Sequence, residues 1–173
     1  MLKLEWLNKD NIEIIKEISF NEFKTDMENV GDLNLYDDVL NGETFNNIDI
    51  NYALIKDDTE NIGVIGYYIP KDDPKAVWLG WFAIKEKLQH KNYGTEGLKL
   101  LIDYVKNKYP NLEVCRTYTG LEKESAVAFY KKFGFIQEKE AYKLVSDNEN
   151  TVIFNYPLNS DGRYKEWNQI PLW

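Results

Sequence analysis

The sequence predicts a single domain of the α/β (α+β) class, in which a mixed central sheet carries helices on both faces. The expected elements follow one another in the order β-α-α-β-β-β-α-β-α-β-β. The run from Val77 to Ile84 is almost entirely apolar, which is typical of a strand buried on both faces. Two helices, Gly94 to Lys108 and Lys123 to Phe133, then alternate with strands, an arrangement that packs helices against a sheet.

Length and composition describe a soluble globular chain. Its 173 residues suit one domain, which would bury about two-thirds of its unfolded surface. No apolar run approaches the ~20 residues that a membrane span needs. The N-terminus has neither the apolar stretch nor the cleavage site of a signal peptide. The one cysteine, Cys115, excludes an internal disulfide and fits a reducing compartment, so we expect a cytoplasmic protein.

Charge and ligand counts exclude further classes. With one histidine and one cysteine, a zinc site of the usual type is excluded, and we expect no metal. The net charge of −8 argues against nucleic-acid binding, which needs a basic face. We expect neither a nucleic-acid nor a membrane partner. Between Asn21 and Asp49 many acids stand against Lys24 alone. This segment is either a solvated acidic surface or an electrostatic funnel for a cationic substrate.

The first part of the chain is expected to fold as a strand, two helices and a pair of strands. Leu2 to Leu7 alternates as a strand does, and Asp10 with Glu13 forms a capping box that opens a helix towards Phe23. Gly31 separates this helix from the next. The following expected elements are a short helix, a loop and two paired strands: Leu33 to Leu40, Asn46 to Asp49, Tyr52 to Lys56 and Gly63 to Ile69.

The second part is expected to close the sheet. Gly80 within the apolar run marks a bulge or a close backbone approach. Gly134 lies where a helix C-terminus favours positive φ. The other expected elements are a strand, a turn and a closing hairpin: Leu112 to Thr117, Tyr118 to Gly120, and Phe135 to Val145 with Thr151 to Tyr156.

The end of the chain is a separate extension in our prediction, with residues 1–158 forming the domain and residues 159–173 following it. The extension includes Trp167, Ile170, Leu172 and Trp173. A solvated tail seldom carries so many large apolar groups. We therefore expect it to pack either on the domain or on the second subunit of a homodimer.

A loop that enters a helix is the strongest candidate site. Between Ile84 and Lys108 a basic, polar loop leads into the first amphipathic helix, whose N-terminal N–H groups lack partners and carry partial positive charge. Gly94 and Thr95 keep that end uncluttered, and His90 with Lys91 adds donors. This pattern is typical of a site for phosphate or pyrophosphate. Neither a G-x-x-x-x-G-K-[ST] nor a G-x-G-x-x-G phosphate motif is present.

Two spacings in this region resemble one family. Gln89-x-x-Asn92-x-Gly94 directly follows the central strand, and Ala126-x-x-x-Tyr130 leads into Lys131-Lys132-Phe133-Gly134-Phe135 about thirty residues later. Together they resemble the two signatures of the GCN5-related N-acetyltransferase (GNAT) family, which uses acetyl-CoA as its co-substrate. Asn92 replaces a glycine of the first signature, and Lys123 replaces an asparagine of the second. Because asparagine tolerates positive φ better than most residues, the turn is expected to survive.

The resemblance implies the acyl-CoA N-acyltransferase fold and assigns roles residue by residue. The pantetheine arm would lie in a V-shaped gap between Val77–Ile84 and Leu112–Thr117. Backbone groups that pair with its amides would be those of Phe82, Ala83 and Ile84. The pyrophosphate would be held by Gln89, His90, Lys91, Asn92, Tyr93, Gly94 and Thr95. The lower arm and adenosine would be flanked by Lys123, Ala126, Phe129 and Lys132. Lys91 and Lys132 either meet phosphate charge or are exposed lysines without a role.

The implied chemistry is direct attack of an amine on the acetyl-CoA thioester. A backbone N–H near Phe82 or Ala83 would stabilise the carbonyl oxygen. Tyr130 would either protonate the departing thiolate or be a core tyrosine. The candidates for a base acting through water are Glu22, Asp38 and Glu43, and the alternative is that no protein base is used. Cys115 is expected to be structural.

Three functions remain open from the sequence. The first is N-acetylation of a small, cationic amine. The second is acetylation of a protein or peptide N-terminus, and the third is a non-catalytic CoA-binding module, which Asn92 and Lys123 motivate.

Overall fold

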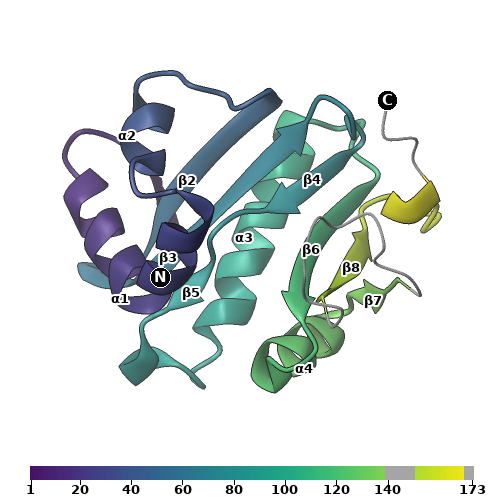
Figure 1. The fold of residues 1–173 in the computed structure, drawn as a ribbon. Helices are drawn as coiled ribbons and strands as arrows, with labels where there is room; N and C mark the ends of the chain where they lie inside the picture. Colours follow the sequence, from purple (N-terminus) through teal and green to yellow (C-terminus); the bar gives the residue numbers. More distant parts are fainter. Residues whose placement is uncertain (139–150, 170–173) are drawn as a thin grey trace.

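The computed structural model describes residues 1–138 and 151–169, which form one mixed sheet with helices on both faces (Figure 1). The strands are β1 (Leu2–Trp6), β2 (Asn47–Asp57), β3 (Glu60–Pro70), β4 (Ala76–Leu79), β5 (Ala83–Ile84), β6 (Val114–Gly120), β7 (Ile136–Gln137) and β8 (Thr151–Pro157). The helices are α1 (Ile12–Val30), α2 (Leu35–Leu40), α3 (Tyr93–Lys108) and α4 (Glu124–Phe133), with short 3-10 turns η1 (Glu86–Leu88) and η2 (Trp167–Gln169). The predicted fold class is confirmed.

The strands lie in the order β1-β2-β3-β4-β6-β8-β7, and β5 pairs with β3 beside β4. Neighbouring strands are antiparallel except β4 and β6, which run parallel. The chain returns from β4 to β6 through α3, because parallel neighbours need a crossover connection. The one parallel pair therefore lies inside an otherwise antiparallel sheet.

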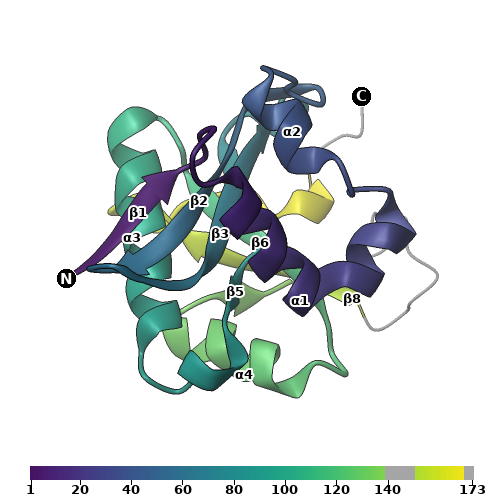
Figure 2. The same cartoon turned by 90° about the vertical axis from the view of Figure 1, so that its left-hand side faces the viewer.

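Alternation along the central strands builds two apolar layers, one on each side of the sheet. Ala53 and Ile55 point to the side where α3 packs, whereas Tyr52 and Leu54 point to the side of α1 and α2. Figure 2 shows α1 and α2 on one face and α3 on the other. Both faces are thus covered near β2 and β3, which explains why these strands read as nearly continuous apolar runs.

Two predictions in the first part of the chain are wrong. The Asp10–Glu13 capping box does not form, because the N-cap of α1 is Asn11. Instead, the Asn8 side chain accepts N–H groups of Asp10 and Asn11 at 2.8 and 3.1 Å. Residues 46–49 were expected to be a loop, but β2 begins at Asn47. A register shift between Asn47 and Asp49 lets that irregular segment join the sheet.

Two further predictions need correction in the second part. The run Val77 to Ile84 is divided into β4 and β5 by three residues outside any strand. The turn expected at Tyr118 to Gly120 is absent, because β6 continues through these residues and pairs with β8. Part of the closing hairpin predicted from Phe135 to Val145 lies outside the described residues, as do the last four residues of the tail.

A buried charged network ties the C-terminal segment to the sheet. The guanidinium of Arg116, which is 1% exposed, donates from Nε to Asp73 at 2.9 Å and from Nη1 to Asn155 at 2.9 Å. Its Nη2 donates to the backbone carbonyl of Lys165 at 2.8 Å, and Glu138 lies 3.6 Å from Nη1. The segment therefore rests on the domain through a group that has no access to water.

The apolar side of that contact is aromatic. The ring of Trp167 meets that of Trp78 edge-on at 5.4 Å, and Tyr164 packs on the same small cluster. Within the described residues, no helix combines the length and the apolar character needed to cross a membrane.

We predict that Arg116→Ala lowers the free energy of unfolding by about 3–5 kcal/mol, because it leaves Asp73 and Glu138 as buried, uncompensated acids. Urea denaturation measures the change. Arg163→Ala is the matched control, since this arginine is 88% exposed in its own ion pair and its removal should cost under about 0.5 kcal/mol. Equal effects of the two substitutions would show that the buried network does not stabilise the fold.

Candidate functional site

The sheet is split next to its one parallel pair. β4 and β6 pair only from Ala76 to Trp78, opposite Val114 to Arg116. Beyond that point β6 continues to Gly120 with β8 as its partner, while β5 pairs with β3. The edges of β5 and β6 that face each other therefore lack strand partners in the described residues. Such edges present free N–H and C=O groups to a ligand.

A one-residue bulge causes the split. The four steps from Leu79 to Ala83 lie opposite only three steps of β3, from Tyr67 to Val64. Gly80 still donates its N–H to Gly66 at 2.8 Å, but no backbone hydrogen bond from the N–H of the next two residues is formed within the described chain. A bulge re-aims the backbone and is frequent beside active sites. Donors thus remain available at the bulge.

Gly80 also provides the close approach that its position suggested. A Cβ at Gly80 would lie 2.8 Å from the ring of Tyr52, and one at Gly66 would lie 2.1 Å from it. The aromatic ring of Tyr52 therefore lies flat across bare backbone of β3 and the bulge, with its hydroxyl 2.9 Å from the position of the missing Gly80 Cβ.

The loop before α3 turns twice through left-handed backbone. His90 has φ 64° and Asn92, the N-cap of α3, has φ 68°. The turn at Asn92 thus forms with asparagine, as the sequence predicted. Gln89 donates its Nε2 to the carbonyl of Ile84 at 3.0 Å, which ties the loop to the end of β5. The free N–H groups of the first turn of α3 lie directly after this loop.

The fold brings the three predicted segments together. The rings of Phe82 and Phe129 meet edge-on with centroids 5.9 Å apart. A Cβ on Gly94 would lie 3.3 Å from the Phe129 ring and 3.8 Å from Ile84. The bulge, the first turn of α3 and the inner face of α4 are therefore neighbours in space. Gly94 keeps the junction open, since any side chain there would press on Phe129.

Tyr130 lies on α4 over the gap in the sheet. Its ring packs against Phe129, Phe135 and Phe154, with centroids 5.4, 5.3 and 6.1 Å away. Burial raises the pKa of the Tyr130 hydroxyl to about 12, against a smaller lowering by a hydrogen bond with the Thr117 side chain. The hydroxyl thus stays protonated at neutral pH and faces β6, where that strand has lost its parallel partner.

Other predicted residues lie further from this junction. Tyr93 donates its hydroxyl to Asp57 at the end of β2 at 3.1 Å. Lys123 lies 3.8 Å from Asp26 of α1, in an exposed ion pair that joins α4 to the opposite wall. Among the predicted site residues at the loop and at α4, some are exposed to solvent: Gln89, His90, Lys91, Asn92, Lys123 and Lys132. Thr95 and Ala126 are partly buried.

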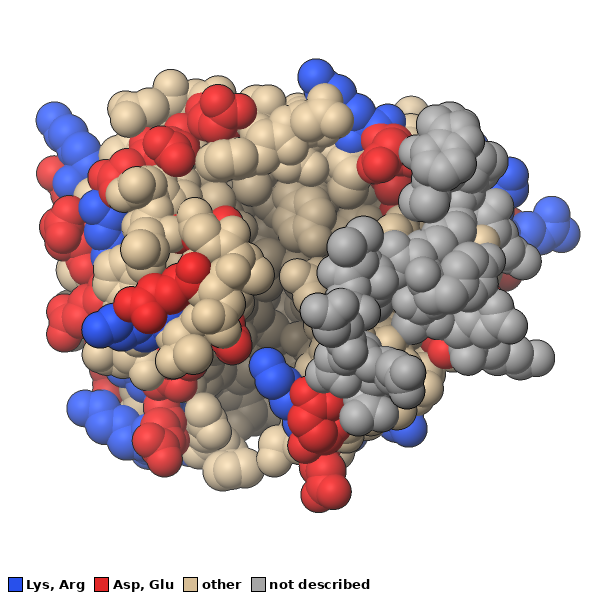
Figure 3. All heavy atoms as spheres, in the orientation of Figure 1, with Lys and Arg blue, Asp and Glu red and all other residues tan. Residues whose placement is uncertain are grey.

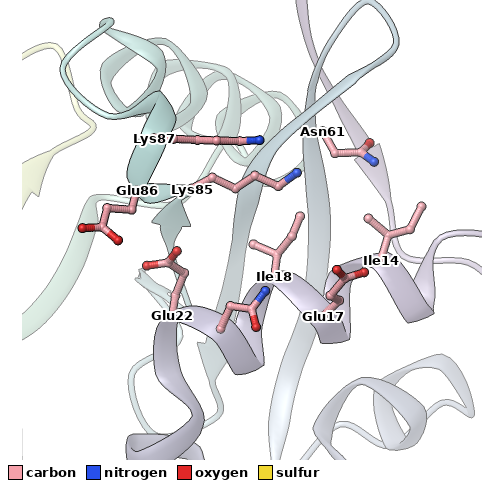
Figure 4. A pocket seen from close by; sticks show the side chains of 9 residues that line it. Ile14, Glu17, Ile18, Glu22, Asn61, Lys85, Glu86 and Lys87 are labelled. Atoms are coloured by element: carbon pink, nitrogen blue, oxygen red, sulfur yellow. The ribbon is translucent and has the colours of Figure 1, made fainter.

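The acids considered as a base are not equivalent. The Glu43 carboxylate accepts the N–H groups of Thr44 and Phe45 at 3.0 and 2.9 Å, and Asp38 is exposed on α2. Glu22 lies on the wall of an open pocket of about 450 Å³ between α1 and the segment after β5. Figure 4 shows Lys85 and Lys87 extending across this pocket towards Asn61. The pocket mixes both signs of charge and is not at the bulge.

One acid near the bulge was missed from the sequence. Asp32 follows Gly31, which ends α1 with φ 76°, and its carboxylate accepts the indole N–H of Trp81 at 3.3 Å. Trp81 belongs to the bulge itself. The sequence shows a helix-ending glycine followed by an acid. It does not predict the contact, because Asp32 and Trp81 are 49 residues apart in the chain.

Cys115 is buried on β6, and burial raises its pKa to about 12. A thiol that stays protonated is a poor nucleophile, so these properties suit a structural residue. No group of three or more metal-ligating side chains occurs within residues 1–138 and 151–169.

Figure 3 shows that the molecule is hollowed beside the side formed by α1 and α2. The visible wall of the hollow is mostly uncharged, and the acidic side chains of the α1–α2 side spread over its rim and outer surface. The split sheet lies in the middle of the same face (Figure 1).

Comparison with known proteins agrees with this geometry. Residues 11–135 match the Acetyltransferase (GNAT) family. A solved structure described as an acetyltransferase of that family from Desulfovibrio desulfuricans superposes with a TM-score of 0.73 at 15% identity, over 91% of this chain and 99% of that one.

Two other solved structures have the same fold at low identity. A dodecameric spermidine N-acetyltransferase from Vibrio cholerae gives a TM-score of 0.61 at 15% identity, covering 89% of this chain and 91% of that one. A ribosomal L7/L12 alpha-N-protein acetyltransferase in complex with coenzyme A gives 0.68 at 14%, covering 90% and 93%. No curated protein matches the sequence.

The left-handed turn at Asn92 gives a prediction for the loop. Asn92→Ala should destabilise this turn by about 1 kcal/mol, because a Cβ without a polar group is disfavoured at positive φ. Asn92→Gly should leave it intact or improve it. Calorimetric titration with acetyl-CoA should then show weaker binding for alanine and equal or tighter binding for glycine. Equal affinity of the two variants would mean that the turn does not contribute to binding.

Proposed function

This chain belongs to the GNAT family of acetyltransferases, enzymes that use acetyl-CoA, and we propose that it transfers the acetyl group to a primary amine of a small, cationic acceptor. The observation that carries the proposal is the split between β5 and β6, with unpaired N–H groups at the bulge on one side and Tyr130 on the other. A split of this kind admits an extended ligand between two strand edges, where backbone groups can pair with it as a strand would.

The residues of the split fit a ligand with amides and a pyrophosphate. The backbone of Phe82, Ala83 and Ile84 offers edge groups, and the loop from Gln89 to Thr95 offers N–H groups at a helix N-terminus, which favour anions. Phe129 supplies an apolar contact next to Gly94. When bound, acetyl-CoA supplies the activated acetyl group.

The protein groups around the split have distinct roles in acetyl transfer. An N–H donor at Phe82 or Ala83 would polarise the carbonyl that the amine attacks, so that the C–N bond forms as the C–S bond breaks. The Tyr130 hydroxyl, kept protonated by burial, would donate its proton to the departing sulfur. The amine must be neutral to attack, and its own proton would leave through water in the open hollow.

A small cationic acceptor is supported by charge and by relatives. The chain carries a net charge of −8, and acidic side chains spread over the rim and outer surface of the α1–α2 side of the hollow. One structural relative is a spermidine N-acetyltransferase. The second candidate, a peptide N-terminus, is favoured by the relative that acetylates a ribosomal protein at its N-terminal amine.

The release of CoA thiol over an acceptor panel tests the proposal. We expect turnover with polyamines and other small cationic amines, and slower or no turnover with peptides. Turnover of peptides alone would favour the second candidate. Acetyl-CoA binding without turnover of any acceptor would favour a non-catalytic module, and failure to bind acetyl-CoA would contradict the assignment of the split as its site.

Tyr130→Phe tests the acid. We expect turnover to fall about a hundredfold, since general acid catalysis contributes at least that much, while acetyl-CoA affinity stays within about twofold because the ring contacts remain. Because the pKa of Tyr130 is about 12, the turnover of wild type and of the variant should change with pH in the same way below pH 12. Tyr104→Phe, in a tyrosine that packs on Trp6, is the control. Unchanged turnover in Tyr130→Phe would exclude the acid role.

A further inference from the structure

We infer that Asp32, Trp81, Tyr68 and Tyr118 form a carboxylate–aromatic subsite that binds a second, non-reacting ammonium group of the acceptor. The inference rests on the proposed function and narrows its substrate class to amines that carry two or more positive charges. The subsite lies on the α1–α2 face of the sheet, beside the bulge.

Asp32 is the charged member of the subsite. Its carboxylate is half-buried and, among residues 1–138 and 151–169, accepts one hydrogen bond, from the Trp81 indole at 3.3 Å. Burial raises its pKa, because one neutral donor does not replace the lost water. Two lysines on the walls pair with other acids, Lys16 with Asp37 and Lys123 with Asp26. Within the described residues Asp32 has no ion-pair partner, so an entering ammonium would be its counter-ion.

Aromatic rings lie on the same face of the sheet, in two groups. Trp81 packs against Phe23 at 5.0 Å, which fixes its indole towards Asp32. Trp78 holds Tyr68 on one side at 6.2 Å and Tyr118 on the other at 6.3 Å, and Tyr118 is 52% exposed. Exposed and half-buried aromatic faces attract ammonium groups through the ring quadrupole.

The hydroxyl groups around Asp32 do not neutralise it. Burial raises the pKa of Tyr36, Tyr52, Tyr68 and Tyr118, and the negative charge of Asp32 raises each of them further. Tyr68 lies two residues from Gly66, and Trp78 lies two residues from Gly80, so both side chains are on the same face of the sheet as Tyr52, next to the bulge that carries Trp81. The tyrosine hydroxyls stay protonated and therefore neutral. They can orient the ammonium group, and Asp32 remains its counter-ion.

The bulge that carries Trp81 connects Asp32 to the reaction centre. Gly66 and Gly80 have no side chains, and the ring of Tyr52 lies over them with its hydroxyl beside Gly80. An acceptor that extends past the bulge can place one nitrogen near the bulge donors and another near Asp32. The nitrogen at Asp32 is not the reacting one, because a carboxylate keeps an amine protonated and a protonated amine cannot attack.

A matched pair of acceptors tests the subsite. Putrescine and butylamine have the same chain length and differ by one amino group. We expect wild-type kcat/KM to be about tenfold to a hundredfold higher for putrescine, as for a charge-assisted hydrogen bond out of solvent. Asp32→Asn should remove most of this preference by raising KM for putrescine, and should leave butylamine within about twofold. Glu28→Gln, at an exposed acid on α1, should keep the preference.

The aromatic part is tested separately. Tyr118→Ala should raise the KM for putrescine severalfold, whereas Tyr118→Phe should stay near wild type, because the ring face is retained. An unchanged putrescine preference in Asp32→Asn would overturn the inference. So would a loss of kcat for both amines without a change in KM, since that result would make Asp32 a base.

Failure of the proposed function is distinguishable from failure of the subsite. If no amine is acetylated, calorimetric titration of spermidine into the CoA-loaded protein still tests Asp32. Binding by wild type that is lost in Asp32→Asn would support the subsite in a protein that is not an amine acetyltransferase. Absence of spermidine binding, or equal binding by the variant, would overturn it.

Discussion

The site depends on one mismatch in backbone pairing between β3 and the strand beside it. The extra residue between Leu79 and Ala83 makes continuous pairing with β3 incompatible with continuous pairing with β6. β5 stays with β3 and β6 stays with β8, so the sheet opens between them. The cost is a set of backbone groups without strand partners, and those groups are the ones that a ligand with amides and a carbonyl can use.

The surrounding elements keep this opening from closing. α3 packs behind it through its buried face, and Phe129 of α4 lies against Phe82 and the Gly94 turn. On the other side the network around Arg116 fixes β6 to β8 and to the C-terminal segment. The β6 wall is thus held by contacts that do not cross the gap, whereas the rings of Phe82 and Phe129 meet across it. The exposed pair between Lys123 and Asp26 does cross the hollow, but such pairs contribute little.

Periodicity and turn chemistry predicted the fold class, because strand alternation and helix-ending glycines such as Gly134 act locally. Turn chemistry also located the loop at Asn92, whereas the second motif at Tyr130 was identified by its resemblance to the family signature. One local feature was mispredicted, because the Asn8 side chain replaced the expected capping box. The extension of β6 through Tyr118 was not predicted because it depends on pairing with β8, which is distant in the sequence. Asp32 belongs to the same class, since only the fold brings it to Trp81.

The packing of Tyr52 on Gly66 and Gly80 has a consequence for how this sequence can diverge. Neither glycine can gain a side chain while the ring is present, because the nearest ring atoms lie 2.1 and 2.8 Å from the two Cβ positions. A smaller residue at position 52 would free that space and make substitutions at both glycines tolerable. The three positions therefore form an epistatic unit, and sequences that keep the aromatic residue should keep both glycines with it.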